Sequence, residues 1–179
     1  MNKIMKTDWA YLAGLIDGDG CFTISLTQGR GTHGIKKNVL SISPRIAISL
    51  KSSDGHSLCA LKLKFGLGNI YHIKTLTCEA KQAWIILKID EIIYVIRNLL
   101  PYLWIKKEKG IKFLELCEHW KSTSLSVPDR MKGIRHTQSE MLHLVEVACT
   151  LNYDRQTVRY RDKKGLSYWT PLIKEWYPE

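Results

Sequence analysis

The 179-residue sequence lacks the features of several common protein classes. It has no CxxC pair, and its five cysteines are odd in number and widely spaced, which argues against a structural zinc site and a disulfide framework. No apolar run is long enough to span a bilayer, and the N-terminus lacks the pattern of a signal peptide. These absences predict a soluble intracellular protein without membrane contact, from a prokaryotic cytoplasm or from an organelle.

Acidic residues are scarce relative to basic ones. The sequence has 17 Asp and Glu against 27 Lys and Arg, which gives a formal net charge of +10. A surplus of this size favours a polyanionic partner, most commonly nucleic acid. The chain length suits one sizeable core with an appendage. We predict a core domain over residues 1–150 and a basic, aromatic C-terminal extension over residues 151–179, which either contacts the DNA backbone or packs on its own subunit.

The segment LAGLIDGDG, residues 12–20, is the strongest single signal. Ala10, Gly14 and Gly18 recur every fourth residue, so on a helix they form one face without bulk that a second helix can approach closely. Asp19 follows at the helix C-terminus, where the macrodipole disfavours a carboxylate by roughly 0.3–1 kcal/mol unless a cation offsets it. Two paired helices would bring two Asp19 carboxylates together, and carboxylate oxygens are ligands that Mg²⁺ prefers.

Hydrophobic periodicity predicts an α+β fold. Helical patterns follow the first helix at residues 56–65, 92–100, 107–121 and 137–150, and alternating patterns predict strands at 21–28, about 40–49, 69–74 and 81–88. Pro44 interrupts the second strand pattern and predicts a bend or bulge there. In the first two strands, the polar residues share the face away from the core: Thr23, Ser25, Thr27, Ser41, Ser43 and Arg45.

Residues 12–20 closely resemble the defining motif of the LAGLIDADG homing endonucleases, with Gly18 in place of alanine. The resemblance implies an αββαββα fold over residues 8–150, with a saddle-shaped antiparallel sheet in the DNA major groove and extra C-terminal helices. A single motif per chain implies a homodimer on a pseudo-palindromic, double-stranded DNA target. The implied activity is site-specific, metal-dependent hydrolysis of both strands by an intron-encoded homing endonuclease.

The resemblance also implies roles for individual residues. Asp19 and the Gly18 carbonyl would bind Mg²⁺, for which Mn²⁺ would substitute. Residues 100–107 resemble the family's stretch with an active-site lysine, which maps to Lys106. The expected dimer interface comprises Ala10, Ala13, Gly14, Asp17 and Gly18. The expected DNA contacts are Thr23, Ser25, Thr27, Arg30, Lys36, Lys37, Ser41, Ser43, Arg45, Lys51, Lys74 and Lys81.

One position departs from the family pattern. Related single-motif enzymes have a polar residue, often Gln, near the end of the second strand, where this sequence has Leu50 between Ser49 and Lys51. Two other functions therefore stay open: an RNA maturase that binds its own intron RNA, and a DNA-binding protein that does not cleave. The intact Asp19 and Lys106 favour cleavage over both.

Overall fold

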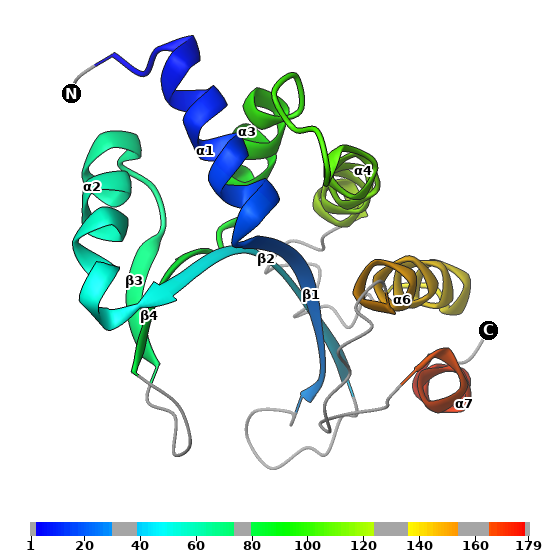
Figure 1. The fold of residues 1–179 in the computed structure, drawn as a ribbon. Helices are drawn as coiled ribbons and strands as arrows, with labels where there is room; N and C mark the ends of the chain where they lie inside the picture. The colour runs from blue at the N-terminus through cyan, green and yellow to red at the C-terminus, as the bar shows by residue number, and fades with distance from the viewer. Residues whose placement is uncertain (1–2, 30–38, 74–79, 124–135, 154–164, 178–179) are drawn as a thin grey trace. The chain divides into compact units, whose positions relative to one another are not determined.

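The structure is a computed structural model that describes residues 3–29, 39–73, 80–123, 136–153 and 165–177. The chain follows the order α1 (Lys6–Gly18), β1 (Gly20–Gly29), β2 (Val39–Lys51), a 3-10 turn (Ser52–Asp54), α2 (Gly55–Phe65), β3 (Asn69–Ile73), β4 (Lys81–Ile86), α3 (Ile89–Leu99), α4 (Lys107–Thr123), α6 (Gln138–Tyr153) and α7 (Leu166–Trp176). This order confirms the expected αββαββα core followed by C-terminal helices (Figure 1).

The four strands form one sheet in the order β1-β2-β4-β3. β4 pairs antiparallel with β2 on one side and with β3 on the other, so β3 is an edge strand. β2 continues through Pro44, so the proline does not end the strand.

By its internal contacts, the chain divides into two compact units. Unit 1 comprises Met1–Thr23 and Pro44–Cys117, and unit 2 comprises Ile24–Ser43 and Glu118–Glu179.

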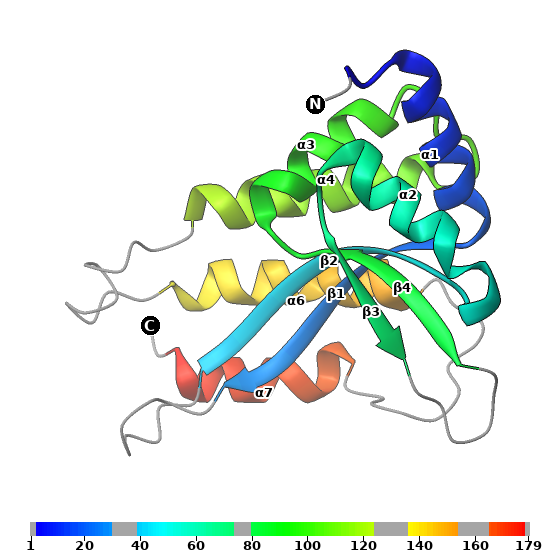
Figure 2. The ribbon, with the colours of Figure 1, turned by 90° about the vertical axis from the view of Figure 1, so that its left-hand side faces the viewer.

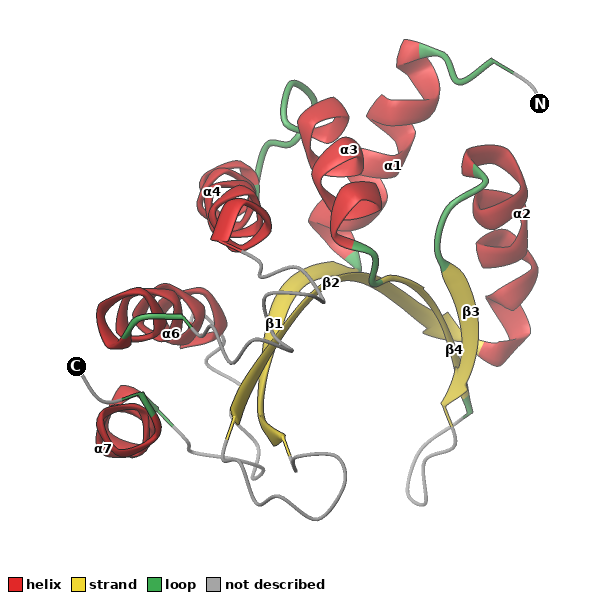
Figure 3. Ribbon diagram, turned by 180° about the vertical axis from the view of Figure 1, so that it is seen from behind, coloured by secondary structure: helices red, strands yellow, loops and turns green. Residues whose placement is uncertain are grey.

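In unit 1, α1, α2 and α3 lie on one side of β3 and β4 (Figures 1 and 3). Ile48 and Trp84 are opposite each other in the register of β2 and β4, and both are fully buried on this side. The Trp84 ring lies 6.2 Å from the ring of Phe65 in α2, and the indole nitrogen donates a 2.8 Å hydrogen bond to the Leu67 carbonyl. The other side of these strands therefore faces away from the helices.

Unit 2 contains α6 and α7 side by side (Figure 2). Trp169, Ile173 and Trp176 are buried and recur with helical spacing along α7. Tyr177 follows α7; its hydroxyl accepts the Leu40 N–H at 3.3 Å, and its carbonyl accepts a 2.8 Å bond from the Gln138 amide. This part of the C-terminal extension packs on its own chain, whereas its basic run over residues 154–164 lies outside the described residues.

The start of α6 is closed by a reciprocal pair of hydrogen bonds. The Glu140 carboxylate accepts the Thr137 N–H at 2.9 Å, and the Glu140 N–H donates to the Thr137 hydroxyl at 3.2 Å. The backbone hydrogen bond lowers the pKa of Glu140 below its ordinary value; partial burial opposes this, and the nearby His136 and His119 add to it.

Candidate functional site

The two faces of α1 differ sharply. Ala10, Gly14 and Gly18 are exposed, and a Cβ atom placed on either glycine would meet nothing within 4 Å. We call these three residues the small-residue face. Ala13, which the sequence analysis placed in a dimer interface, is instead fully buried with Leu12 in the core of its own unit. A side chain without exposed surface has none to offer a partner, so that assignment of Ala13 is wrong.

The C-terminal end of α1 forms a tight corner with β1. Asp19 caps the helix, and its N–H donates a 2.9 Å bond to the Leu15 carbonyl. Gly20 is buried at the start of β1, and a Cβ there would lie 2.6 Å from the Ile16 Cα atom. Only glycine fits at this close approach, and the corner leaves Asp19 exposed.

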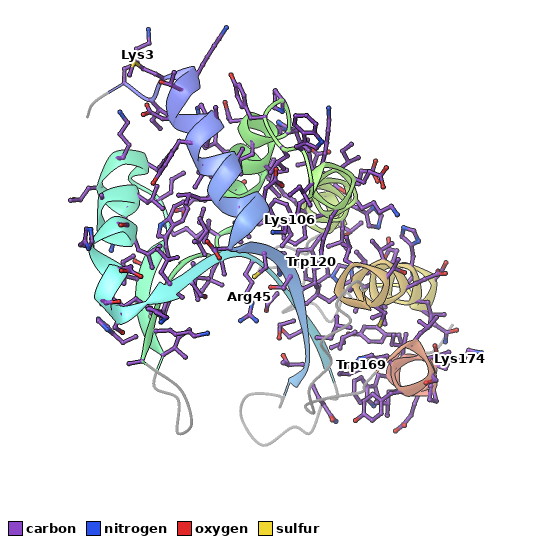
Figure 4. All side chains as sticks on the ribbon, viewed as in Figure 1. Lys3, Arg45, Lys106, Trp120, Trp169 and Lys174 are labelled. Atoms are coloured by element: carbon purple, nitrogen blue, oxygen red, sulfur yellow. The ribbon has the colours of Figure 1, made fainter. Side chains whose placement is uncertain are left out.

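Lys106 supplies a cation to this corner (Figure 4). Its Nζ donates 2.6 Å hydrogen bonds to the Ile16 and Asp17 carbonyls and lies 3.4 Å from the Gly18 carbonyl oxygen. These are among the last carbonyls of α1, the negative end of the helix dipole, where a positive charge is favourable. The structure thus places Lys106 at the helix end that carries Asp19. The sequence analysis assigned these two residues to the same site.

Asp17 fixes the chain segment from which Lys106 extends. Its carboxylate accepts the backbone N–H groups of Trp104 at 2.8 Å, Ile105 at 3.2 Å and Lys106 at 2.9 Å. The sequence analysis placed Asp17 in the dimer interface and did not foresee these bonds. The one available signal was angular: Asp17 lies roughly 200° round the helix from Asp19, so the two carboxylates point in different directions.

The polar residues of the first two strands keep the predicted alternation. In unit 1, Arg45 is exposed on the side of the sheet away from α1, and its Nε donates a 2.9 Å bond to the Thr23 hydroxyl (Figure 4). In unit 2, Thr27, Ser41 and Ser43 are exposed and Ser25 is half-buried, whereas Ile24 and Ile42 are buried. Lys51 and Lys81 of unit 1 are exposed and directly opposite each other. Arg30, Lys36, Lys37 and Lys74 lie outside the described residues.

The model of the LAGLIDADG endonuclease family matches residues 12–120, a span that includes the α1 corner and Lys106. The chain belongs to this family. A search of curated proteins gave no match.

Solved structures of homing endonucleases share the fold. I-CvuI in complex with its target aligns with a TM-score of 0.72 at 14% identity over 96% of this chain and 95% of that chain. The archaeal, intron-encoded I-Vdi141I complexed with DNA aligns with a TM-score of 0.71 at 21% identity over 95% and 96%. The meganuclease I-AabMI bound to uncleaved DNA aligns with a TM-score of 0.63 at 21% identity, over 94% of this chain and only 49% of that chain.

Leu50, the departure from the family pattern, is half-buried and lies opposite Gln82 in the register of β2 and β4. It shares the face of Ile48, which is fully buried beneath the helices, so its side chain is on the helix-covered side of the sheet. The exposed neighbours Ser49 and Lys51 are on the open side.

The family uses divalent metals: I-CvuI complexes were solved with 2 mM Ca or 2 mM Mg. Among the described residues, no group of three or more His, Cys, Asp or Glu side chains is arranged to hold a metal ion. One exposed carboxylate, Asp19, and the nearby Gly18 carbonyl are the available oxygen ligands at the α1 corner. This sparse set fits Mg²⁺, which keeps several waters and takes one or two carboxylates together with substrate phosphates.

The described part of the chain holds no helix that is both long and apolar enough to cross a membrane. Four cysteines in it, Cys21, Cys59, Cys117 and Cys149, are not part of a disulfide bond.

Proposed function

We propose that this protein is a site-specific, Mg²⁺-dependent endonuclease that acts as a homodimer and cleaves both strands of a long, pseudo-palindromic DNA target. One observation carries the proposal: the small-residue face of α1 ends at an exposed carboxylate, Asp19, with the Lys106 ammonium hydrogen-bonded beneath the same helix end. Pairing two such helices through their small-residue faces would place two carboxylates and two ammonium groups around one site.

The residues of the corner have separate tasks in this proposal. Asp19 and the Gly18 carbonyl would hold the divalent ion, which supplies an activated water and charge stabilisation when bound. Lys106 Nζ lies 2.6 Å from two other carbonyls but 3.4 Å from that of Gly18, so the Gly18 oxygen keeps lone-pair capacity for a metal. The fixed ammonium would stabilise negative charge that develops on the phosphate in the transition state.

Homodimerisation is supported by the exposed glycines and by the presence of one motif in this sequence. This chain matches only 49% of I-AabMI while 94% of its own length is covered, so that relative is about twice as long as one copy of this fold. A chain with one copy needs a second copy to supply the other half of the site.

The deciding experiment is a cleavage-site selection from a random double-stranded DNA library in Mg²⁺, with Asp19→Asn as the matched control. We expect the wild-type chain to enrich cut molecules that share a pseudo-palindromic site and the variant to enrich none. Binding without cutting by the wild-type chain would favour a DNA-binding protein without nuclease activity, and failure to bind DNA together with binding of its own intron RNA would favour a maturase.

A further inference from the structure

The open side of the sheet in unit 1 contains an apolar strip that the predicted DNA contacts do not include. The register of β2, β4 and β3 aligns three cross-strand rows on this side: Ala47–Ile85–Asn69, Ser49–Ala83–Tyr71 and Lys51–Lys81–Ile73. These rows alternate with those of Ile48–Trp84 and Ile46–Ile86, which are buried beneath the helices. Successive residues of a strand point to opposite faces, so the three rows face away from the helices.

Two large side chains of the edge strand β3 stand out on this side. Tyr71 is 40% exposed and Ile73 is 38% exposed, although both belong to a sheet with a well-covered opposite face. Ala83, the direct neighbour of Tyr71 on β4, has only a methyl group and is fully buried, and Ile85 is half-buried one row further on. We call Tyr71, Ile73 and Ile85 the apolar strip.

Charge indicates what covers the strip. Lys51 and Lys81 lie directly opposite each other in the same row as Ile73. Two neighbouring, exposed ammonium groups on one face of the sheet attract an anion. A DNA backbone supplies such anions at regular spacing, whereas an apolar protein partner would have to bury both ammonium groups.

We infer that Tyr71 and Ile73 recognise thymine methyl groups in the major groove, while Lys51 and Lys81 hold the adjacent phosphates. This inference rests on the proposed function, because it needs the sheet to bind duplex DNA. The C5-methyl of thymine is the apolar group that a base pair presents in the major groove, and apolar side chains select it. RNA is a poor match, since uracil lacks this methyl and the A-form major groove is too deep and narrow for side chains to read.

The inference predicts a specific sequence preference. Positions of the half-site contacted by β3 should be thymine, and the preference should depend on the methyl group and not on hydrogen bonds. Deoxyuridine tests this separation, because it keeps every hydrogen-bonding group of thymine and lacks only the methyl.

In the experiment, the wild-type chain first selects duplexes from a random DNA library in EDTA, so that no strand is cut. The selected pool is then amplified with either thymidine or deoxyuridine triphosphate, and the affinities for the two pools are compared. We expect the wild-type chain to bind the thymine pool more tightly by about fourfold for each contacted methyl, as for one buried CH₂ group. Ile73→Ser should reduce the ratio of the two affinities towards one, and Ile73→Val should largely retain it.

Leu63→Ser is the matched control, because Leu63 is 86% exposed on α2, which lies on the helix-covered side of the sheet. It should leave the ratio unchanged. Enrichment of a defined sequence with equal affinity for both pools, or an unchanged ratio in Ile73→Ser, would overturn the methyl contact while leaving DNA recognition intact. A wild-type chain that enriched no duplex at all would overturn the proposed function, and this inference with it.

Discussion

Replacing Gly14 by leucine should change two properties in opposite directions: the stability of the single chain and its ability to form a dimer. Gly14 lies in the middle of α1, is exposed, and has nothing within 4 Å of the position that a Cβ would occupy. A larger side chain therefore meets no obstacle within its own chain. In the proposed dimer, the same side chain would occupy the space of the partner helix.

The two effects have opposite signs. Glycine is about 0.8–1 kcal/mol less favourable than alanine in a helix interior, and leucine is close to alanine. The substitution should therefore raise the melting temperature of the single chain by about 2–4 °C, the usual shift per kcal/mol for a protein of this size. Overpacking typically costs about 1–3 kcal/mol per site, and a twofold axis places Gly14 of both copies in the interface. The dimer should weaken by about 2–6 kcal/mol, or roughly 30-fold at least.

Sedimentation over a range of protein concentrations, together with thermal melting at each concentration, measures both effects. We expect the melting temperature of the wild-type chain to rise with concentration, because pairing stabilises the folded state by mass action, and that of Gly14→Leu to stay constant. Gly20→Ala is the matched control: its Cβ would lie 2.6 Å from the Ile16 backbone, so it should lower the melting temperature without blocking pairing.

A Gly14→Leu chain that sediments as a dimer at the wild-type concentration would refute the interface. At protein concentrations too low for the wild-type chain to pair, a fall in the melting temperature of Gly14→Leu similar to that of Gly20→Ala would refute the open surface over Gly14 itself.

Three further substitutions test the site and the fold. Asp19→Asn should abolish cleavage in Mg²⁺ and leave DNA binding largely intact, because it removes the metal ligand and relieves carboxylate repulsion near phosphate; cutting at the wild-type rate in a gel assay would contradict the metal role. Arg45→Ala should relax specificity at one position of each half-site by about 1–3 kcal/mol, measured on a library of single-base target variants, and equal weakening of all variants would mean that Arg45 faces away from the bases. Glu140→Gln should make the free energy of unfolding less sensitive to acid. The lowered pKa of Glu140 stabilises the folded state at any pH above the ordinary glutamate pKa of about 4.3. This contribution is lost as the pH falls from that value through the lowered pKa of Glu140 in the folded state. Melting temperatures at pH 6 and pH 3.5 check this, and an equal loss in both proteins would exclude a role for Glu140.

Local alternation predicted the faces of the strands well. Ser41, Ser43 and Arg45 are exposed and Ile42 is buried, as the period of two residues requires. The strand order needed information that alternation does not contain, because β2 pairs with β4 and not with its sequence neighbour β3.

The last helix escaped prediction although its pattern is helical. Trp169, Ile173 and Trp176 follow the spacing i, i+4, i+7 and are buried. Pro171 lies inside α7, where a proline normally argues against a helix. Burial against α6 outweighed the missing hydrogen bond.

Ala13 shows what the expected interface set left out. It was placed there with Gly14, yet helical periodicity places it with Trp9, Leu12 and Ile16, the buried residues of α1. The angle round the helix decides which face a small residue joins, so the small-residue face consists of Ala10, Gly14 and Gly18.

The bonds between α1 and Lys106 join residues 88–90 positions apart, and no local pattern specifies them. The need for a cation at the helix end was visible in the sequence, but 27 Lys and Arg residues were candidates on charge alone. Asp17 determines which lysine reaches the helix end. Its carboxylate accepts hydrogen bonds from the three N–H groups of Trp104 to Lys106 and so holds Lys106 within reach of the helix carbonyls. One acidic residue of the motif thus positions the ammonium group, and the other, roughly 200° round the helix, stays exposed for a ligand. The spacing of the two carboxylates lets one short motif both position the ammonium group and keep a second carboxylate exposed.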